Sequence, residues 1–75
     1  MYTPSEADQA KIDKNFVYHP PKPDQIPRYE EIRSRAKEFA QFLVETCPSS
    51  RELSLALTHL QECVMLSNAS IACNE

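Results

Sequence analysis

The chain has 75 residues, a net charge of −3 at pH 7 and no glycine. The length allows one domain at most, and the negative charge argues against a surface that wraps DNA or RNA, which would have to be broadly cationic. The glycine-rich loops that carry backbone close to phosphate in Walker-type and dinucleotide-binding proteins are excluded, because the chain has no glycine to form them.

The polar residues 1–17 predict a short N-terminal helical arm. Ser5 can cap a helix, and Glu6 and Asp8 place acidic side chains in its first turn, near the positive end of the helix dipole. We therefore expect a helix from about Glu6 to Lys14. Its few apolar residues give this helix little to bury, which indicates an arm that docks on a partner or stays mobile.

Residues 18–27, YHPPKPDQIP, form a Pro-rich segment that holds four of the six prolines. Proline lacks an amide hydrogen and biases the preceding residue away from helix, so we expect an extended and fairly stiff segment. A linker is the ordinary function of such a segment. This one takes up a large share of the chain, however, and long irregular segments in compact proteins often carry function.

A first long helix is predicted from Arg28 to about Thr46. Pro27 suits its first turn, because the missing amide hydrogen would be unpaired there in any case. Apolar residues follow at steps of three and four, which place them on one stripe of an amphipathic helix. The members of this stripe are Tyr29, Ile32, Ala36, Phe39, Ala40, Leu43 and Val44.

A second long helix is expected after the turn at residues 47–50. Ser49 and Glu52 have the S-x-x-E spacing of a capping box, so this helix begins near Ser49 and runs to about Cys73. The turn is short enough for the two helices to pack antiparallel, as a helical hairpin over residues 28–75. The apolar seam of the second helix consists of Leu53, Leu57, Leu60, Val64 and Ile71.

A further apolar set lies away from this seam. Its members are Leu55, Leu66, Ala69 and Cys73 on the second helix and Phe42 on the first. Two helices cannot cover two stripes, so the surplus predicts neighbouring copies of the chain. The expected fold is therefore all-α: a short N-terminal helix, a Pro-rich linker and an antiparallel two-helix hairpin that assembles into a compact homo-oligomer.

Other stabilisers are less favoured than self-association. The three cysteines cannot all pair within the chain, and no leading apolar segment resembles a signal peptide, which favours a reducing cytosol. No apolar run is long enough to span a membrane. A core of this size contributes only about 3–5 kcal/mol by itself, so we expect copies of the chain to supply the rest.

Two sets of side chains are candidate chemical sites. His59 and Cys63 stand four residues apart and could face one metal, but zinc usually takes four ligands and nothing completes the set. Packing is the favoured interpretation for this pair, because free Cys behaves as a small hydrophobe. Cys47 with His19 or His59 could form a nucleophile and base only if folding brought them together. No catalytic residue, metal or cofactor is predicted, and the chain is not expected to be an enzyme.

Arg33 and Lys37 are four residues apart on the first helix and point the same way. The ordinary interpretation is a solvated face balanced by nearby glutamates. Tyr18 and His19, just upstream, favour a binding function instead. An aromatic ring beside two cations suits a nucleotide, because stacking on a base contributes about 1–3 kcal/mol and the cations meet the phosphates. Spacing alone leaves both interpretations open.

Three segments occur in order along the chain: FVYHPPKP, RYEEIRSRAKEFA and CPSSRELSLALTHLQECVMLSNASIA. The continuous stretch from Phe16 to Asn74 that contains them covers about four-fifths of the chain. This stretch resembles the helical hairpin shared by two phage counter-defence families, the anti-CBASS cyclic-oligonucleotide sponges and the anti-Thoeris sponges. Anti-Thoeris members carry an additional domain ahead of the hairpin, and residues 1–17 leave no room for one, which favours the anti-CBASS type.

The resemblance implies a compact homohexamer in the bacterial host cytoplasm. Such a protein binds cyclic dinucleotides and cyclic trinucleotides without cleaving them, and so keeps the CBASS signal from its effector. The dinucleotide pocket lies between protomers, where a tyrosine stacks on a base and a lysine contacts phosphate. Aligned on this chain, these residues fall on Tyr18 and Lys37. Some relatives have an arginine near the C-terminus where this chain has Cys73, a departure at the trinucleotide contact.

The ligand-binding residues that we predict are Tyr18, Lys37, Arg33 and His19. Tyr18 stacks on a base, Lys37 and Arg33 meet phosphate, and His19 lines the pocket. The competing hypothesis is a non-catalytic protein–protein interaction module. In that case the second apolar stripe binds a different protein, and residues 33–37 form a solvated face.

Overall fold

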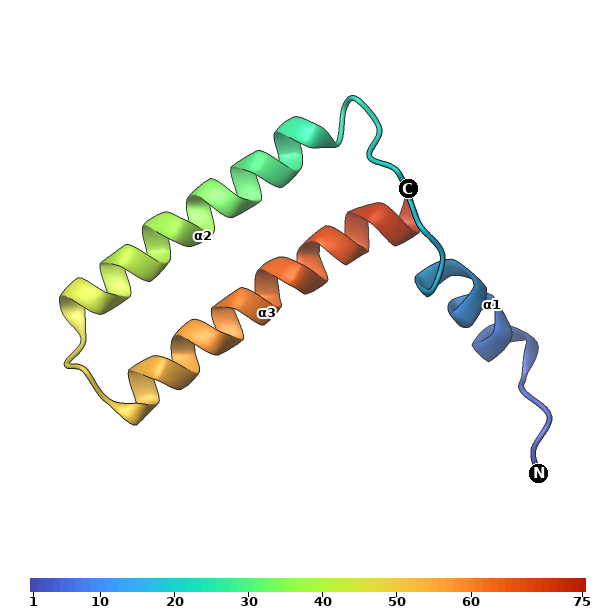
Figure 1. Cartoon of the computed structure of the whole chain (residues 1–75), viewed down its shortest axis with the longest axis horizontal. Helices are drawn as coiled ribbons and strands as arrows, with labels where there is room; N and C mark the ends of the chain where they lie inside the picture. Colours follow the sequence, from blue (N-terminus) through green and yellow to red (C-terminus); the bar gives the residue numbers. More distant parts are fainter.

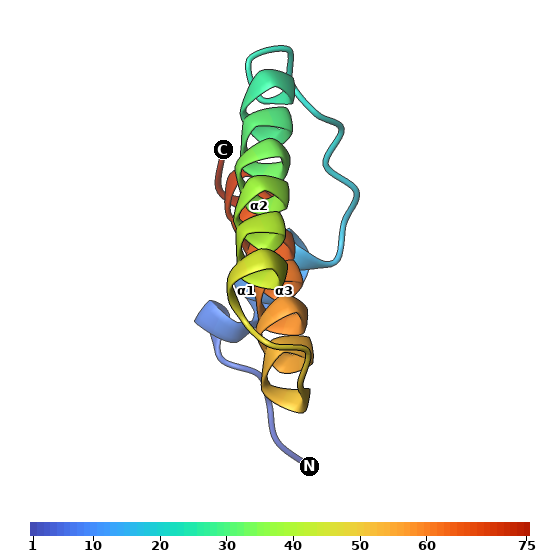
Figure 2. The same cartoon turned by 90° about the vertical axis from the view of Figure 1, so that its left-hand side faces the viewer.

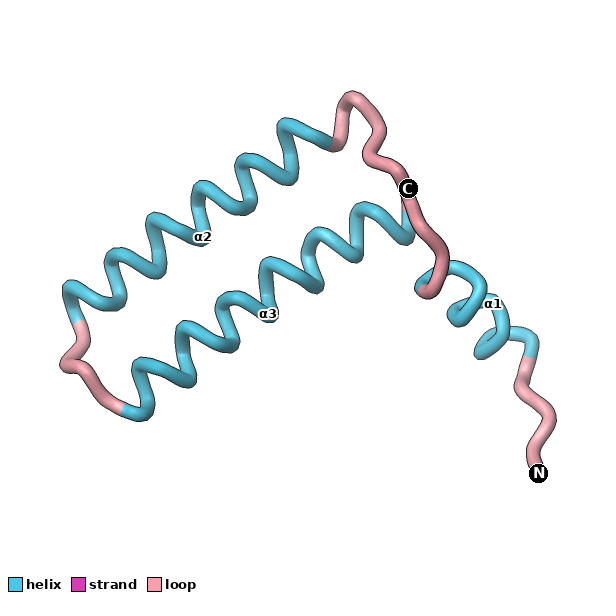
Figure 3. Tube along the Cα trace, in the orientation of Figure 1, coloured by secondary structure: helices cyan, strands magenta, loops and turns pink.

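The computed structural model describes all 75 residues and contains three helices and no strand (Figures 1 and 3). The helices are α1 (Glu6–Asn15), α2 (Ile26–Thr46) and α3 (Arg51–Asn74). The long helices α2 and α3 lie antiparallel, and α1 projects from the end of the hairpin where α3 terminates (Figure 1). None of the three helices combines the length and the hydropathy that a membrane crossing needs. The all-helical hairpin is therefore as predicted.

Local chemistry explains where α1 and α2 begin. Ser5 caps α1, since its hydroxyl oxygen accepts a hydrogen bond from the Asp8 backbone N–H at 3.1 Å, as predicted. The α2 helix begins at Ile26, two residues earlier than expected, with Pro27 in its first turn. Residues 16–25 connect α1 to α2 without helix or strand and run along one side of the hairpin (Figure 2).

The predicted capping box of Ser49 and Glu52 is wrong by one residue. Ser50 is the cap of α3, and its hydroxyl oxygen accepts from the Leu53 backbone N–H at 3.1 Å. The backbone of Ser50 is extended, with φ −163° and ψ 167°, the conformation that lets a side chain fold back onto the first turn. The α3 helix then continues to Asn74, one residue beyond the expected end.

The predicted seam of α3 is confirmed. All five of its residues are half-buried, as are Tyr29, Ile32, Ala36, Ala40 and Leu43 on α2. Phe39 and Val44 were assigned to the same stripe but are exposed. A single partner helix covers a narrower band than these seven residues occupy, so the edge of the stripe stays outside. There the rings of Phe39 and Phe42 stack with centroids 6.3 Å apart.

The hairpin is thin and hides no apolar side chain fully. The whole chain measures 49 × 38 × 14 Å, and its radius of gyration of 16.7 Å exceeds the value of about 11 Å expected for a compact chain of this length. The one buried residue is Gln25, which is polar. The two long helices therefore bury no apolar core within a single chain.

The start of α2 is fastened to the end of α3 around Glu75. Arg28 donates two hydrogen bonds to the Glu75 carboxylate, at 2.8 and 2.7 Å, and Gln25 donates a third at 3.2 Å. Lys22 donates from Nζ to the Glu75 carbonyl oxygen at 2.6 Å and from its backbone N–H to Gln25 Oε1 at 3.0 Å. These four residues, here termed the Glu75 clamp, close the end of the hairpin opposite the turn at 47–50.

Acid is expected to weaken the Glu75 clamp. The hydrogen bonds from Arg28 and then Gln25 lower the pKa of Glu75 from its ordinary value of 4.5. A carboxylate with a lowered folded-state pKa stabilises the fold fully above its unfolded pKa, and this contribution is lost as the pH falls through the folded value. We therefore expect wild type to lose more thermal stability than Glu75→Gln between about pH 6 and about pH 3.

Thermal unfolding followed by circular dichroism measures this difference. Glu30→Gln is the control, because Glu30 is exposed and forms no ion pair. The control should keep the wild-type dependence on pH. Equal losses in wild type and Glu75→Gln would contradict a stabilising clamp.

Candidate functional site

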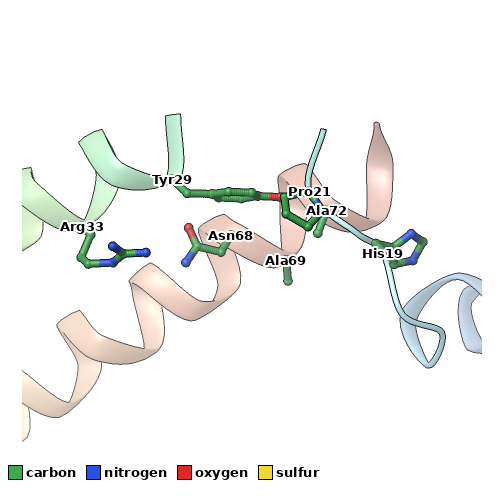
Figure 4. Close-up of a pocket in the computed structure, with 7 residues that line it drawn as sticks. All are labelled: His19, Pro21, Tyr29, Arg33, Asn68, Ala69 and Ala72. Atoms are coloured by element: carbon green, nitrogen blue, oxygen red, sulfur yellow. The ribbon is translucent and has the colours of Figure 1, made fainter. Parts of the chain in front are cut away.

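A hollow of about 350 Å³ lies between the Pro-rich segment and the two long helices (Figure 4). We name it the Tyr29 hollow. Its walls come from three parts of the chain: His19 and Pro21 from the connecting segment, Tyr29 and Arg33 from α2, and Asn68, Ala69 and Ala72 from α3. A cavity of this size falls in the range of small-molecule sites. The hollow therefore exists within one protomer, before any neighbour is added.

The Tyr29 hollow forms because small residues on α3 lie opposite larger residues on α2. Ala69 and Ala72 carry only a methyl group, so α3 leaves space there. Tyr29 and Arg33 are four residues apart on α2 and project on the same side. In Figure 4 the ring of Tyr29 is seen edge-on above α3, and the guanidinium of Arg33 is directed toward the amide of Asn68. The hollow thus joins an aromatic face to a cation.

Arg33 and Lys37 have no carboxylate partner. The ion pairs of the chain are Arg28–Glu75 and Arg35–Glu31, and His59 Nδ1 lies 3.8 Å from Glu62 Oε2. Of the four cations of α2, Arg28 and Arg35 are paired, whereas Arg33 and Lys37 are not. The positive charge of Arg33 and Lys37 is therefore available to an anion.

A second hollow, of about 410 Å³, adjoins the first along α2 and α3. We name it the Lys37 groove. It shares Arg33 with the Tyr29 hollow, and its other lining residues are Ala36, Lys37, Ala40, Leu57, Leu60, Gln61 and Val64. Its surface is almost entirely apolar apart from the two cations and Gln61. Arg33 consequently stands between two hollows, and Lys37 lies over the second.

His19 is held in place by the end of α1. Its Nε2–H donates to the Lys14 carbonyl oxygen at 2.6 Å. A carbonyl oxygen only accepts, so Nε2 carries the proton in this hydrogen bond and Nδ1 is left as an acceptor in the neutral ring. The hydrogen bond ties the α1 arm to the wall of the Tyr29 hollow.

The structure brings three of the four predicted site residues together. His19 and Arg33 line the Tyr29 hollow, and Arg33 and Lys37 line the Lys37 groove. Tyr18 is 84% exposed and lines neither hollow. Its assignment to a base stays a prediction, since the expected pocket lies between protomers.

Sequence reasoning missed five of the seven residues of the Tyr29 hollow, and two of these five, Tyr29 and Asn68, have polar groups. Tyr29 was assigned to the core stripe of α2, although its position four residues before Arg33 could have indicated a shared face. Asn68 gave no signal in the sequence. Its Oδ1 atom is covered and has no hydrogen-bond partner, a property that depends on the packing around it.

The pair of His59 and Cys63 does not pack as expected. Cys63 is exposed, and His59 Nδ1 lies 3.8 Å from Glu62 Oε2 on an open helix face. Two helices leave this face of α3 uncovered, so neither side chain is drawn into the hairpin. No three side chains of the kinds that hold a metal ion gather anywhere in the chain.

The family model described as Acb2/Tad1, hairpin domain, matches residues 8–72. No curated protein matches the chain, and no solved structure does. The matched range includes the last part of α1, the Pro-rich segment and nearly all of the hairpin. Because this match covers most of the chain, the protein belongs to the Acb2/Tad1 hairpin-domain family, that of the anti-CBASS and anti-Thoeris sponges.

Proposed function

We propose that this protein binds and sequesters cyclic oligonucleotide second messengers without cleaving them. Its ligands are cyclic dinucleotides and, in a separate mode, cyclic trinucleotides. Sequestration in the cytoplasm of the bacterial host keeps the signal from activating a CBASS effector. Family membership supports a sponge-type anti-defence role, and the finer assignment to these ligands is our inference.

The observation that carries this proposal is two neighbouring unpaired cations: Arg33, which lines both hollows, and Lys37, which lines the Lys37 groove. Arg33 and Lys37 meet no carboxylate, so a phosphate can bind them without displacing a protein partner. The guanidinium of Arg33 can donate two parallel hydrogen bonds to one phosphate. A cyclic dinucleotide carries two phosphates on a compact ring, and two neighbouring cations match that requirement.

The aromatic groups near these cations support a nucleotide over a simple anion. Tyr18, which one protomer contributes to the pocket, stacks on a base, and His19 lines the wall of the pocket. Stacking on an aromatic side chain tolerates every base, because each base has a π-face. The negative net charge of the chain discourages binding of long nucleic acid, while local cations hold a small ligand.

The surface of one protomer supports assembly into a homo-oligomer, which we propose to be a hexamer. The chain exposes 6359 Å², whereas a compact monomer of this mass exposes about 4,700 Å². The excess of about 1,700 Å² suffices for about two interfaces of standard size per protomer. A dimer would use only one such face. Each copy is therefore expected to contact more than one neighbour.

Native mass spectrometry with cyclic di-AMP and cyclic di-GMP tests the proposal. We expect a homo-oligomer that gains whole cyclic nucleotides, and we expect denaturation to release them with unchanged mass. A monomer or dimer that ignores both ligands would favour the protein–protein interaction module. Recovery of linear products would show that the chain cleaves its ligand, and sequestration would then be wrong.

A further inference from the structure

We propose that Asn68 reads the edge of an adenine base bound in the Tyr29 hollow. This inference rests on the proposed function, because it names the base that the ligand presents. The carrying observation is that Asn68 lines the hollow while its Oδ1 atom is covered and without any hydrogen-bond donor. Buried polar atoms in folded proteins almost always have a partner, so an unpaired amide oxygen beside a cavity indicates that a donor is still to come.

The neighbours of Asn68 do not supply that donor within the protomer. Ala69 and Ala72 have no polar side chain, and the guanidinium of Arg33, although directed toward the amide, forms no hydrogen bond to it (Figure 4). The amide nitrogen of Asn68 forms no hydrogen bond to the chain either. Both ends of the amide are therefore uncommitted, one as an acceptor and one as a donor.

In the proposed pose, a base lies against the ring of Tyr29 with its phosphate on Arg33, and its N6 and N7 edge faces Asn68 on α3. The terminal torsion of an Asn side chain is broad, so the amide can rotate into the hollow as the base enters. After this rotation the Asn68 Oδ1 atom, which is unpaired in the free protein, accepts a hydrogen bond from the ligand.

The chemistry of an amide favours adenine. An Asn side chain forms two hydrogen bonds with the N6 amino group and the N7 atom of adenine, accepting from the first and donating to the second. The corresponding O6 and N7 atoms of guanine are both acceptors, and an amide oxygen finds no donor there. Asn68 is accordingly assigned as a residue that sets base preference, next to cations that set affinity for phosphate.

Calorimetric titration of the full chain with cyclic di-AMP and cyclic di-GMP tests this assignment. We expect wild type to prefer cyclic di-AMP. In Asn68→Ala the side chain loses both hydrogen bonds to adenine, so the ratio of the two affinities should shift toward cyclic di-GMP by about 10- to 100-fold. Asn15→Ala is the matched control, since Asn15 is exposed at the end of α1 and the variant removes the same amide. Its ratio should stay at the wild-type value.

Two further variants keep the test decisive. Asn68→Leu keeps the shape of the side chain without its hydrogen-bonding groups and should shift the ratio in the same direction, which decides the matter should Asn68→Ala fail to fold. Asn68→Gln retains the amide and should keep cyclic di-AMP preferred. An affinity ratio that is unchanged in Asn68→Ala and in Asn68→Leu, with wild type binding both ligands, overturns this inference alone. A wild-type protein that binds neither ligand overturns the proposed function as well.

Discussion

Replacing Arg33 and Lys37 together by alanine is expected to weaken cyclic dinucleotide binding by about 100-fold or more. A hydrogen bond to a charged group contributes about 1.5–3 kcal/mol, and each 1.4 kcal/mol changes affinity tenfold. Lys37→Ala alone should therefore weaken binding by about tenfold. The oligomer should persist in both variants, because neither cation forms an ion pair that holds the fold together.

Isothermal titration with cyclic di-AMP measures the affinity, and light scattering measures the mass of the assembly. Lys11→Ala combined with Arg51→Ala is the matched control, since it removes the same charge from two exposed residues that line no hollow. This control should bind within about twofold of wild type, because it changes only the long-range electrostatic field of the protein. Equal binding by the Arg33 and Lys37 variant and by wild type would show that the site lies elsewhere.

Placing a glutamate at both Phe42 and Leu66 is expected to dissolve the homo-oligomer into monomers. Phe42 is 56% exposed on α2, and Leu66 is 71% exposed on α3. If neighbouring copies cover these side chains, each glutamate would bury an unpaired charge, and the effective penalty is several kcal/mol per ion. Multiplied over every copy, this penalty exceeds what a standard interface supplies.

Size-exclusion chromatography with light scattering gives the mass directly. Gln41→Glu combined with Thr58→Glu adds the same charge at polar, exposed positions of α2 and α3 and should retain the wild-type mass. A Phe42→Glu, Leu66→Glu protein of unchanged mass would mean that these apolar residues face solvent in the assembly. Neighbouring copies would then have to use a different surface.

Periodicity predicted most of the fold, because each helix has to bury one face. The seam of α3 from Leu53 to Ile71 was correct for this reason, and the cap at Ser5 was correct because no neighbouring residue competes for that position. Ser49 and Ser50 do compete. The hydroxyl oxygen of either serine can accept a hydrogen bond from a backbone N–H in the first turn of α3. Which serine becomes the cap depends on which residue after Pro48 has an extended backbone, and this is a property of the turn rather than of either side chain.

The site was harder to predict than the fold. Arg33 and Lys37 could be identified from their helical spacing, but that they lack carboxylate partners became visible only with the structure. Tyr29 has the same sequence signature as a core residue, and only the small residues opposite it create a hollow. The contribution of Tyr18 depends on a neighbouring copy, which the sequence of one chain does not place.

The Glu75 clamp bears on how the Tyr29 hollow accepts a ligand. By joining Lys22, Gln25 and Arg28 to the end of α3, it anchors the segment that carries His19 and Pro21 before any nucleotide arrives. A preorganised wall loses little conformational entropy when the ligand binds, so more of the contact free energy appears as affinity. For the function that we propose, this rigidity would favour capture of the messenger at low concentrations.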